Sequence, residues 1–223
     1  MSLQDKLDAF KADFKAGKGP WFASPDIHPI MERATAELIA SGQAGRAVKA
    51  GERAPTFRLK DQHGNEVSSV ELLDKGPLVV TFYRGVWCPY CNMELQALNE
   101  ALPDLQRYGA SLVAISPQSA VNSRKSERVN GLSFPVLNDP HNDTAAAFGL
   151  RFVLPDYLID VYRARKNDLP MFNGDQSWTL PMPARYVVGM DGVVVYSEVN
   201  PDYTQRPDPS EMIPVLQRLA LPA

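Results

Sequence analysis

The chain has 223 residues, of which 44% are apolar and 22% are charged, with 14 glycines and 19 prolines. This length suits one compact domain with elaborations, and the composition excludes a disordered, collagen-like or coiled-coil protein. The formal charge of −3 provides no long-range attraction to phosphate backbones or anionic lipid, so we expect neither nucleic acid nor a membrane as a partner.

The sequence lacks the features that would predict a membrane-spanning or secreted protein. No run of about 18 apolar residues occurs, and the amino terminus carries acidic residues where a secretory signal carries basic ones. We therefore expect a cytoplasmic protein. Two cysteines are too few for a disulfide-stapled scaffold, and in a reducing compartment such a pair points to redox or metal chemistry.

Residues 1–50 are predicted to form a helical amino-terminal extension. Ser2 and Asp5 resemble a capping box, and a second helix is expected from about 26 to 40. An apolar stripe at helical spacing in the first helix consists of Leu3, Leu7, Phe10 and Phe14. The stripes could pack on the main domain or on another copy of the chain, and the second case would make a homodimer.

From residue 51 to 223, short apolar segments alternate with helical patterns, which predicts an α/β domain. The run 78–83 suits a central strand covered on both faces, and a helix is expected from about 89 to 102. Residues 150–180 show no clear period and are interpreted as an insertion. Asp191-Gly192 between two apolar runs predicts an antiparallel hairpin.

Two caps are expected at later helices. Ser69 is predicted to cap a short helix, and a closing helix is expected to start with Asp208 as its cap and Pro209 in its first turn. The chain contains no G-x-G-x-x-G and no phosphate loop. We therefore predict no nucleotide cofactor, and no other cofactor.

The spacing and position of the cysteines predict a reactive thiol. Cys88 and Cys91 form a C-x-x-C segment between the end of a strand near Tyr83 and the start of a helix near Pro89. At a helix cap, unpaired N–H groups and the helix dipole favour an anion and can lower a cysteine pKa from about 8.5 to between roughly 3.5 and 7.5. Cys88 is the predicted nucleophile and Cys91 its resolving partner, with Trp87 shielding one side.

Two other interpretations of the cysteine pair remain open. Free cysteines are often buried and inert in a core. A zinc site would need four ligands, and His28, His63 and His141 show no spacing that complements C-x-x-C, so no metal is predicted.

The strand, C-x-x-C and helix resemble the thioredoxin-like superfamily, and Cys88-Pro89-Tyr90-Cys91 is the quartet familiar from glutaredoxins. Residues 51 to about 200 are similar to the alkyl hydroperoxide reductase and thiol-specific antioxidant family, closest to its peroxiredoxin-like branch that reads F-Y-R-G-x-W-C-P-Y-C. The resemblance implies a thioredoxin-like fold with a mixed sheet, a peroxidatic Cys88 resolved by Cys91, and a cis Pro183 packed beside the disulfide.

The sequence departs from the peroxiredoxin motif P-x-x-x-[TS]-x-x-C at two positions, which are Thr81 and Gly85. The family's later arginine falls at Pro183, so a cationic group must come from elsewhere. Arg84 and Arg185 are the nearest candidates in sequence, although an exposed strand-end charge is the more usual interpretation of each. Structural roles are expected for three further residues: Glu94 on a solvated helix face, and Tyr83 and Trp178 in the core.

The leading functional hypothesis is a thiol-dependent peroxidase that reduces hydrogen peroxide or alkyl hydroperoxides. Cys88 would become a sulfenic acid, form a disulfide with Cys91, and be recycled by thioredoxin, glutaredoxin or glutathione. The first alternative is a thiol–disulfide oxidoreductase acting on protein or glutathione disulfides. The second is a non-catalytic redox-sensing or metal-binding module.

Overall fold

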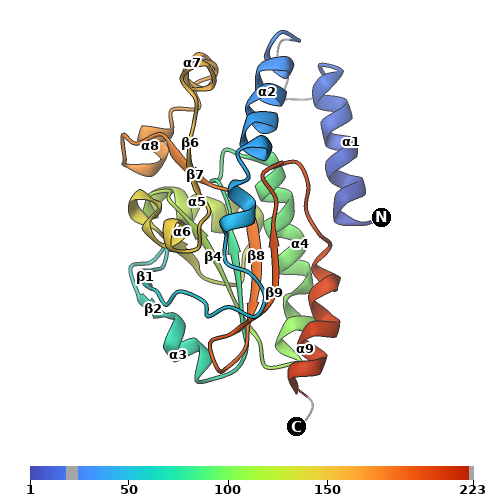
Figure 1. Ribbon diagram of the computed structural model, residues 1–223, viewed down its shortest axis with the longest axis vertical. Helices are drawn as coiled ribbons and strands as arrows, with labels where there is room; N and C mark the ends of the chain where they lie inside the picture. The colour runs from blue at the N-terminus through green and yellow to red at the C-terminus, as the bar shows by residue number, and fades with distance from the viewer. Residues whose placement is uncertain (19–24, 221–223) are drawn as a thin grey trace.

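The computed structural model describes residues 1–18 and 25–220, and its centre is a twisted seven-stranded sheet (Figure 1). The strands follow the order β2-β1-β5-β4-β3-β8-β9. Their bounds are β1 Arg58–Lys60, β2 Glu66–Ser68, β3 Leu78–Phe82, β4 Ser111–Ser116, β5 Val136–Asn138, β8 Ala184–Val188 and β9 Val194–Val199.

The sheet is mixed, as predicted. β3 runs parallel to β4, and β4 runs parallel to β5, whereas β8 pairs antiparallel with both β3 and β9. Every residue of β3 is buried, since helices cover both faces of this central strand. The predicted hairpin joins β8 to β9, and the Gly192 N–H donates to the Gly189 carbonyl across it at 2.8 Å.

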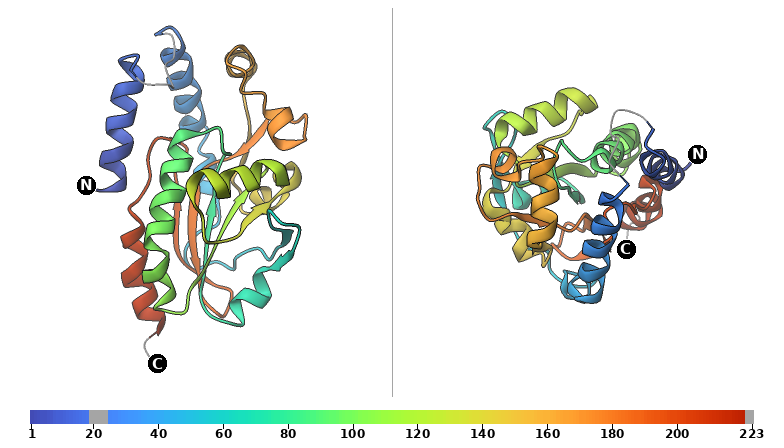
Figure 2. Two further views of the ribbon diagram at one scale, coloured as in Figure 1. Left: turned by 180° about the vertical axis from the view of Figure 1, so that it is seen from behind. Right: turned by 90° about the horizontal axis from the view of Figure 1, so that it is seen from above.

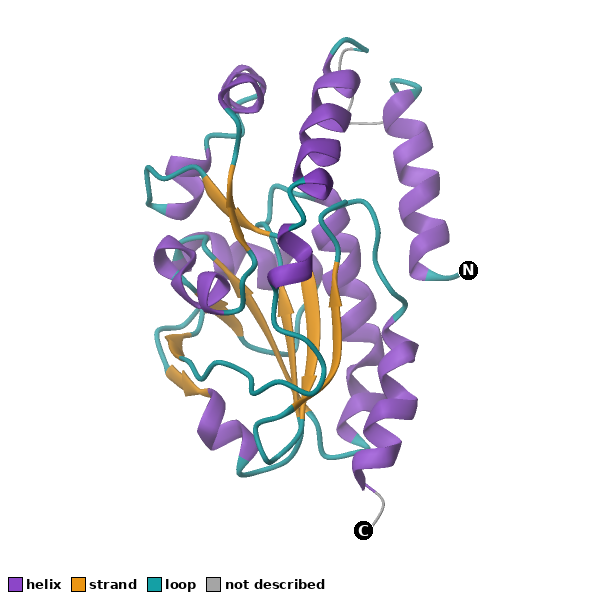
Figure 3. Cartoon of the chain, in the orientation of Figure 1, coloured by secondary structure: helices purple, strands orange, loops and turns teal. Residues whose placement is uncertain are grey.

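Helices cover the two faces of the sheet (Figure 3). α4 (Pro89–Gln106), α5 (Ala120–Asn130) and α9 (Ile213–Ala220) lie on one face, and α3 (Ser69–Leu73) and α6 (Asp143–Ala147) contribute to the other. Short 3-10 helices span Gln43–Arg46, Pro140–Asn142 and Pro209–Met212.

Helix bounds differ from the prediction at two places. α4 continues past Pro103 to Gln106, because Leu102 and Leu105 are buried against the sheet and hold the helix through the proline. Ser68, one residue before the predicted Ser69, caps α3 by accepting a hydrogen bond from the Glu71 N–H. The Ser69 hydroxyl instead accepts from the N–H of Phe57 at 2.9 Å.

The segment 150–180 is folded, although its sequence shows no clear period. It contains β6 (Arg151–Val153), α7 (Asp156–Ala164), α8 (Leu169–Asn173) and β7 (Thr179–Pro181), and β6 and β7 form a separate two-stranded sheet. A small apolar cluster of its own holds it together, in which Leu169 and Leu180 are fully buried.

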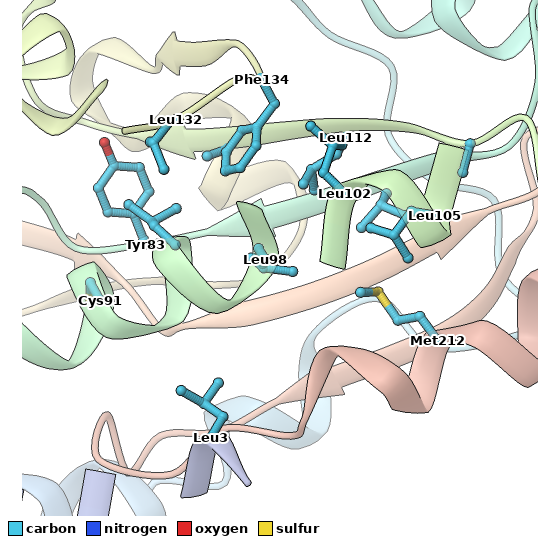
Figure 4. Close-up of a cluster of buried hydrophobic side chains, with 14 of the residues drawn as sticks. Leu3, Tyr83, Cys91, Leu98, Leu102, Leu105, Leu112, Leu132, Phe134 and Met212 are labelled. Atoms are coloured by element: carbon cyan, nitrogen blue, oxygen red, sulfur yellow. The ribbon is translucent and has the colours of Figure 1, made fainter. Parts of the chain in front are cut away.

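The amino-terminal helices α1 (Leu3–Lys15) and α2 (Ile27–Ala40) pack on the rest of the same chain. The predicted capping box of Ser2 and Asp5 is present. α1 lies along α4 (Figure 2), and Leu3 joins the cluster of buried side chains that includes Cys91 (Figure 4). α2 packs against α7. Residues 19–24 of the predicted extension lie outside the described residues, and the homodimer stays a prediction.

A substitution tests the packing of α1. Leu7 is fully buried, so Leu7→Ala removes methyl groups and leaves a cavity, and we expect the free energy of unfolding to fall by about 2–5 kcal/mol. Lys6→Ala, on the exposed side of the same helix, should change it by less than about 0.5 kcal/mol. Urea denaturation measures both, and equal effects of the two substitutions would show that α1 does not pack on α4 in solution.

Candidate active site

The connection from β3 to α4 places Cys88 at the start of a helix. The chain turns at Gly85, which has a φ of 143°, and the Cys88 N–H donates to the Gly85 carbonyl at 3.0 Å. The Val86 N–H donates to the Gln118 side chain at 2.9 Å, which fixes the turn on the neighbouring strand connection. Cys88 is the residue that precedes the first turn of α4 and Pro89 is its first residue, where the missing N–H costs nothing.

Both thiols are free and buried, with Cys88 1% and Cys91 0% exposed. Burial opposes ionisation of Cys88, but hydrogen bonds from the Cys91 thiol and backbone N–H, together with the charge of Arg84, outweigh it and lower the pKa of Cys88 to about 6. Burial and the neighbouring Cys88 sulfur raise the pKa of Cys91 well above its usual range. The pair therefore holds one proton, and Cys91 carries it near neutral pH.

Arg84 is the cation of this site, and it is buried (4% exposed), so its interpretation as an exposed strand-end charge is wrong. Its guanidinium lies 4.2 Å from the Tyr203 ring centroid and 4.9 Å from that of Trp87, and it donates to the Tyr162 hydroxyl. These aromatic groups accept a cation that water would otherwise solvate. The burial of Arg84 follows from contacts with residues 78 and 119 positions away, which no local sequence pattern shows.

Arg185 is also buried, but it points to a different partner. Its Nη2 donates to Glu94 at 2.9 Å, and its Nη1 donates to the Pro207 carbonyl at 3.3 Å. Glu94 is 2% exposed, so its interpretation as a solvated helix residue is wrong as well. The two charges face each other across the interface between β8 and α4, and each compensates the burial of the other. Arg185 therefore stabilises Glu94 and does not stand beside Cys88.

Arg206 is the site residue that the sequence analysis missed. It lies after β9, where its Nε donates to Glu94 at 2.5 Å and its Nη2 lies 3.9 Å from the Cys91 Sγ. Its Nη1 donates to two backbone carbonyls, those of Tyr203 and Gln205. Arg206 is separated from Cys91 by 115 residues. No sequence motif around Arg206 predicts this contact.

The cis bond expected before Pro183 is wrong, since no peptide bond of the described residues is cis. The trans form is the lower-energy state of an X–Pro bond by about 0.5–1 kcal/mol. Here it fits an extended segment fixed on both sides: the Met182 N–H donates to the Leu150 carbonyl at 2.9 Å, and the Pro183 carbonyl accepts from the Asn200 N–H at 3.2 Å. Pro183 leads from β7 into β8 and lines an apolar cavity beside Arg84.

Aromatic rings close the site on the side of the amino-terminal extension. Tyr90, directly after Pro89, packs edge-to-face on Phe10 of α1 at 5.1 Å and on Tyr203 at 5.6 Å, and Trp87 packs on Tyr162 of α7 at 5.5 Å between ring centroids. α1, α2 and α7 lie at one end of the molecule (Figures 1 and 2). The two segments that elaborate the domain thus enclose the thiol pair.

Two cavities meet at Arg84. The smaller, of about 270 Å³, is lined by Cys88, Arg84 and Trp87 together with residues of α1 and α7. The larger, of about 450 Å³, lies between α2 and the segment 152–162, and Arg84, Tyr162 and Tyr203 line both. Its other walls are mostly apolar, including Met31, Ala34, Leu38, Phe152, Leu154 and Leu158.

The remaining sequence candidates do not line either of these two cavities. Tyr83 is a core residue whose hydroxyl donates to Ser126 at 3.1 Å, and Trp178 packs in the cluster of the segment 150–180. Residues 1–18 and 25–220 contain no group of three or more His, Cys, Asp or Glu side chains arranged to hold a metal ion. In the same residues, no helix is long and apolar enough to cross a bilayer.

Gly85 stands where the peroxiredoxin motif has Thr or Ser, and the structure explains why a side chain does not fit. A Cβ at this position would lie 2.6 Å from Trp87 Nε1, and the φ of 143° disfavours any L side chain. We therefore expect Gly85→Thr to displace Trp87 and to lower the free energy of unfolding by about 2 kcal/mol or more, without raising the reactivity of Cys88. Gly131→Asn is the control, because its φ is also positive but its Cβ would meet nothing within 4 Å. Thermal unfolding of both variants measures the effect, and a stable, more reactive Gly85→Thr would contradict this geometry.

The sequence model of the AhpC/TSA family matches residues 50–197, which include the strand, both cysteines, α4 and the hairpin. The chain belongs to the AhpC/TSA family. The match ends before Arg206, and α1 and α2 precede it.

Relatives of this AhpC/TSA chain include proteins named as thiol-disulfide oxidoreductases and proteins named as peroxiredoxins. The thiol-disulfide oxidoreductase ResA of Geobacillus thermodenitrificans is 31% identical over 115 residues, 51% of this chain and 65% of ResA. A Mycobacterium tuberculosis protein that carries a peroxiredoxin name is 31% identical over 99 residues, 44% of this chain and 62% of that protein. The alignments thus span less than two thirds of these two relatives.

A solved structure supports the fold of this AhpC/TSA chain. The crystal structure of peroxidoxin BcpB from Mycobacterium tuberculosis superimposes with a TM-score of 0.60 at 22% identity, covering 77% of this chain and 96% of that one. The predicted thioredoxin-like architecture, a mixed sheet flanked by helices, is therefore confirmed.

Proposed function

We propose that the protein is a thiol-dependent peroxidase in which Cys88 attacks a hydroperoxide. The observation that carries this proposal is the juxtaposition, in one small cavity, of a thiol whose pKa is lowered and the buried cation Arg84. The thiolate is the nucleophilic form of cysteine, and a buried cation stabilises the charge that develops on the leaving oxygen. Arg84 thus takes the place of the family arginine that Pro183 replaces.

In the proposed reaction, the Cys88 thiolate forms a bond to the outer oxygen of the hydroperoxide as the O–O bond breaks. The sulfur is oxidised to a sulfenic acid, and the alkoxide or hydroxide that leaves takes up the proton that Cys88 gave up on ionisation. Two donors, Arg84 Nε and Trp87 Nε1, are buried without an acceptor among the described residues. A hydroperoxide oxygen would supply the acceptor that such groups need.

Burial of the sulfur favours a hydroperoxide over a protein disulfide as the oxidant. Cys88 is 1% exposed behind α1 and α7, so a folded protein disulfide cannot reach it in this arrangement. The apolar cavity that shares Arg84 would take the carbon chain of an alkyl hydroperoxide. We therefore infer that alkyl hydroperoxides react faster than hydrogen peroxide.

One observation favours a second candidate, a thiol–disulfide oxidoreductase. The ResA relative carries that name, and the threonine and arginine of the peroxiredoxin motif are both replaced in this chain. This activity requires α1 or α7 to move away from Cys88 before a protein disulfide can bind. A glutathione disulfide is the smaller substrate of this class.

A rapid-mixing experiment separates the two functions. The reduced protein is mixed with hydrogen peroxide, with cumene hydroperoxide or with oxidised glutathione, and the fluorescence change from Trp87 beside Cys88 is followed. The peroxidase predicts reaction with a hydroperoxide about 10²-fold or more faster than free cysteine at equal ionisation. Reaction no faster than that, with rapid reaction of oxidised glutathione, would replace the peroxidase by the oxidoreductase.

The recycling partners and the cellular setting are part of the same proposal. We infer that thioredoxin, glutaredoxin or glutathione reduces the Cys88–Cys91 disulfide, and that α1 or α7 moves away from Cys88 before either of the two proteins does so. Pro89, Trp87 and Tyr90 shape the surroundings of Cys88 in this proposal. The cytoplasmic location and the division into an extension of residues 1–50 and a domain of residues 51–223 stay predictions.

A further inference from the structure

The sulfur of Cys91 has a cation of its own. Arg206 Nη2 lies 3.9 Å from the Cys91 Sγ, and both residues are almost completely buried. The other donors of this guanidinium are engaged by Glu94 and by the carbonyls of Tyr203 and Gln205, so the side chain is held in one orientation. The contact is therefore a fixed feature of the fold.

Carboxyl groups face the two arginines behind Cys91. Arg185 and Arg206 donate to Glu94 at 2.9 and 2.5 Å, and both also act on Glu198, whose pKa burial raises to about 7. Arg206 is the member of this group that contacts the sulfur. A cation within about 4–6 Å favours the ionised form of a thiol.

The groups that act on Cys91 change when Cys88 is oxidised. Cys88, Arg206 and Arg84 are the neighbouring charges that influence Cys91, and Tyr83 and Tyr162 are the other titratable side chains near it. In the reduced pair, the Cys88 thiolate holds the proton on Cys91. A sulfenic acid at Cys88 is neutral, so this repulsion disappears and the attraction by the two arginines remains.

We infer that Arg206 is a positioning residue for the resolving step, which favours the thiolate of Cys91 once Cys88 has been oxidised. This inference rests on the proposed peroxidase function. In the step itself, Cys91 loses its proton and its sulfur forms the S–S bond to Cys88. The S–O bond of the sulfenic acid breaks, and the hydroxide that leaves takes up that proton and becomes water. No outside oxidant is needed.

Titration of Cys91 alone tests the inference. In the Cys88→Ser protein, the ultraviolet absorbance of the thiolate reports Cys91 without any reagent having to reach it. At a fixed pH, Arg206→Met should lower the amount of Cys91 thiolate by a factor of about ten or more. Arg206→Lys should give an amount of thiolate near that of the parent. Arg185→Met is the matched control, since it removes a buried arginine from the same carboxylate without touching sulfur, and its effect should be smaller.

The kinetics of the full protein give a second readout. In Arg206→Met with both cysteines present, the disulfide should form about tenfold or more slowly once the sulfenic acid is present. Formation of the sulfenic acid should slow less, because the charge of Arg84 acts on Cys88 more strongly than that of Arg206. Raising the pH should bring the rate of disulfide formation in Arg206→Met back toward the parent rate. A merely structural role of Arg206 would not produce this recovery. Should Arg206→Met not fold, Arg206→Gln carries the same prediction, because it removes the charge and keeps a hydrogen-bond donor.

The outcomes separate this inference from the function on which it rests. An unchanged Cys91 titration in both neutral variants overturns the role of Arg206, whatever the protein does with peroxide. Absence of any sulfenic acid in the Cys91→Ser protein after mixing with hydroperoxide overturns the peroxidase, while the titration in Cys88→Ser still decides whether Arg206 sets the ionisation of Cys91.

Discussion

Cys88→Ser is expected to abolish the reaction with hydroperoxide, with a loss of about 10⁴-fold or more in the second-order rate constant. A serine hydroxyl at the cap of α4 is not ionised near neutral pH and is a poor nucleophile toward an O–O bond. The fold should stay intact, because serine is only slightly smaller than cysteine and is a preferred residue at a helix cap. Stopped-flow fluorescence with cumene hydroperoxide measures the loss.

Cys91→Ser is the matched variant of this test. It should keep the first oxidation step, since the serine hydroxyl can still donate a hydrogen bond to the Cys88 sulfur, but it should accumulate the sulfenic acid because no resolving thiol is present. A sulfenic-acid reagent and mass spectrometry detect this species. Rapid peroxide reduction by Cys88→Ser, or no accumulation of the sulfenic acid in Cys91→Ser, would contradict the assigned roles.

Arg84→Met should slow the same oxidation step by about 10²–10³-fold, the effect of removing one preorganised charge donor from an active site. Methionine keeps most of the buried volume between Trp87 and Tyr203 but removes the cation that lowers the pKa of Cys88. The variant should therefore also need a higher pH to reach its maximal rate. Stopped-flow rates measured as a function of pH give both effects.

Two variants serve as controls for Arg84→Met. Arg84→Lys retains a positive charge without the planar donor group, and its rate should fall between those of the parent and Arg84→Met. Arg163→Met removes an exposed arginine from α7, and should leave the rate unchanged. Equal rates for Arg84→Met and the parent would show that another group stabilises the leaving oxygen.

The parts of the fold that local patterns determine could be predicted from the sequence. The buried strand before the cysteines, the C-x-x-C segment at a helix start, the Asp-Gly hairpin and the capped first helix all depend on neighbours within a few residues, and each is present. The segment 150–180 could not be predicted, because its short elements are held by a small cluster and not by a long period.

The electrostatics of the site could be predicted only in part. The helix cap indicates an acidic Cys88 by itself, but which cations support the pair depends on long-range packing. Arg84 and Arg185 are adjacent to the same structural elements, yet one faces aromatic rings beside the sulfur and the other a buried carboxylate. Arg206 comes from beyond the family match, where no motif exists to compare.

The most direct test of the central claim, that Cys88 is ionised near neutral pH, is a thiolate titration of the Cys91→Ser protein by ultraviolet absorbance. The lowered pKa of Cys88 predicts a midpoint at about pH 6. The sign is fixed by the chemistry: as the pH falls through this midpoint the sulfur is protonated, and the rate of peroxide reduction should fall with it. A midpoint at or above about 8.5, the ordinary value for a cysteine, would contradict the claim.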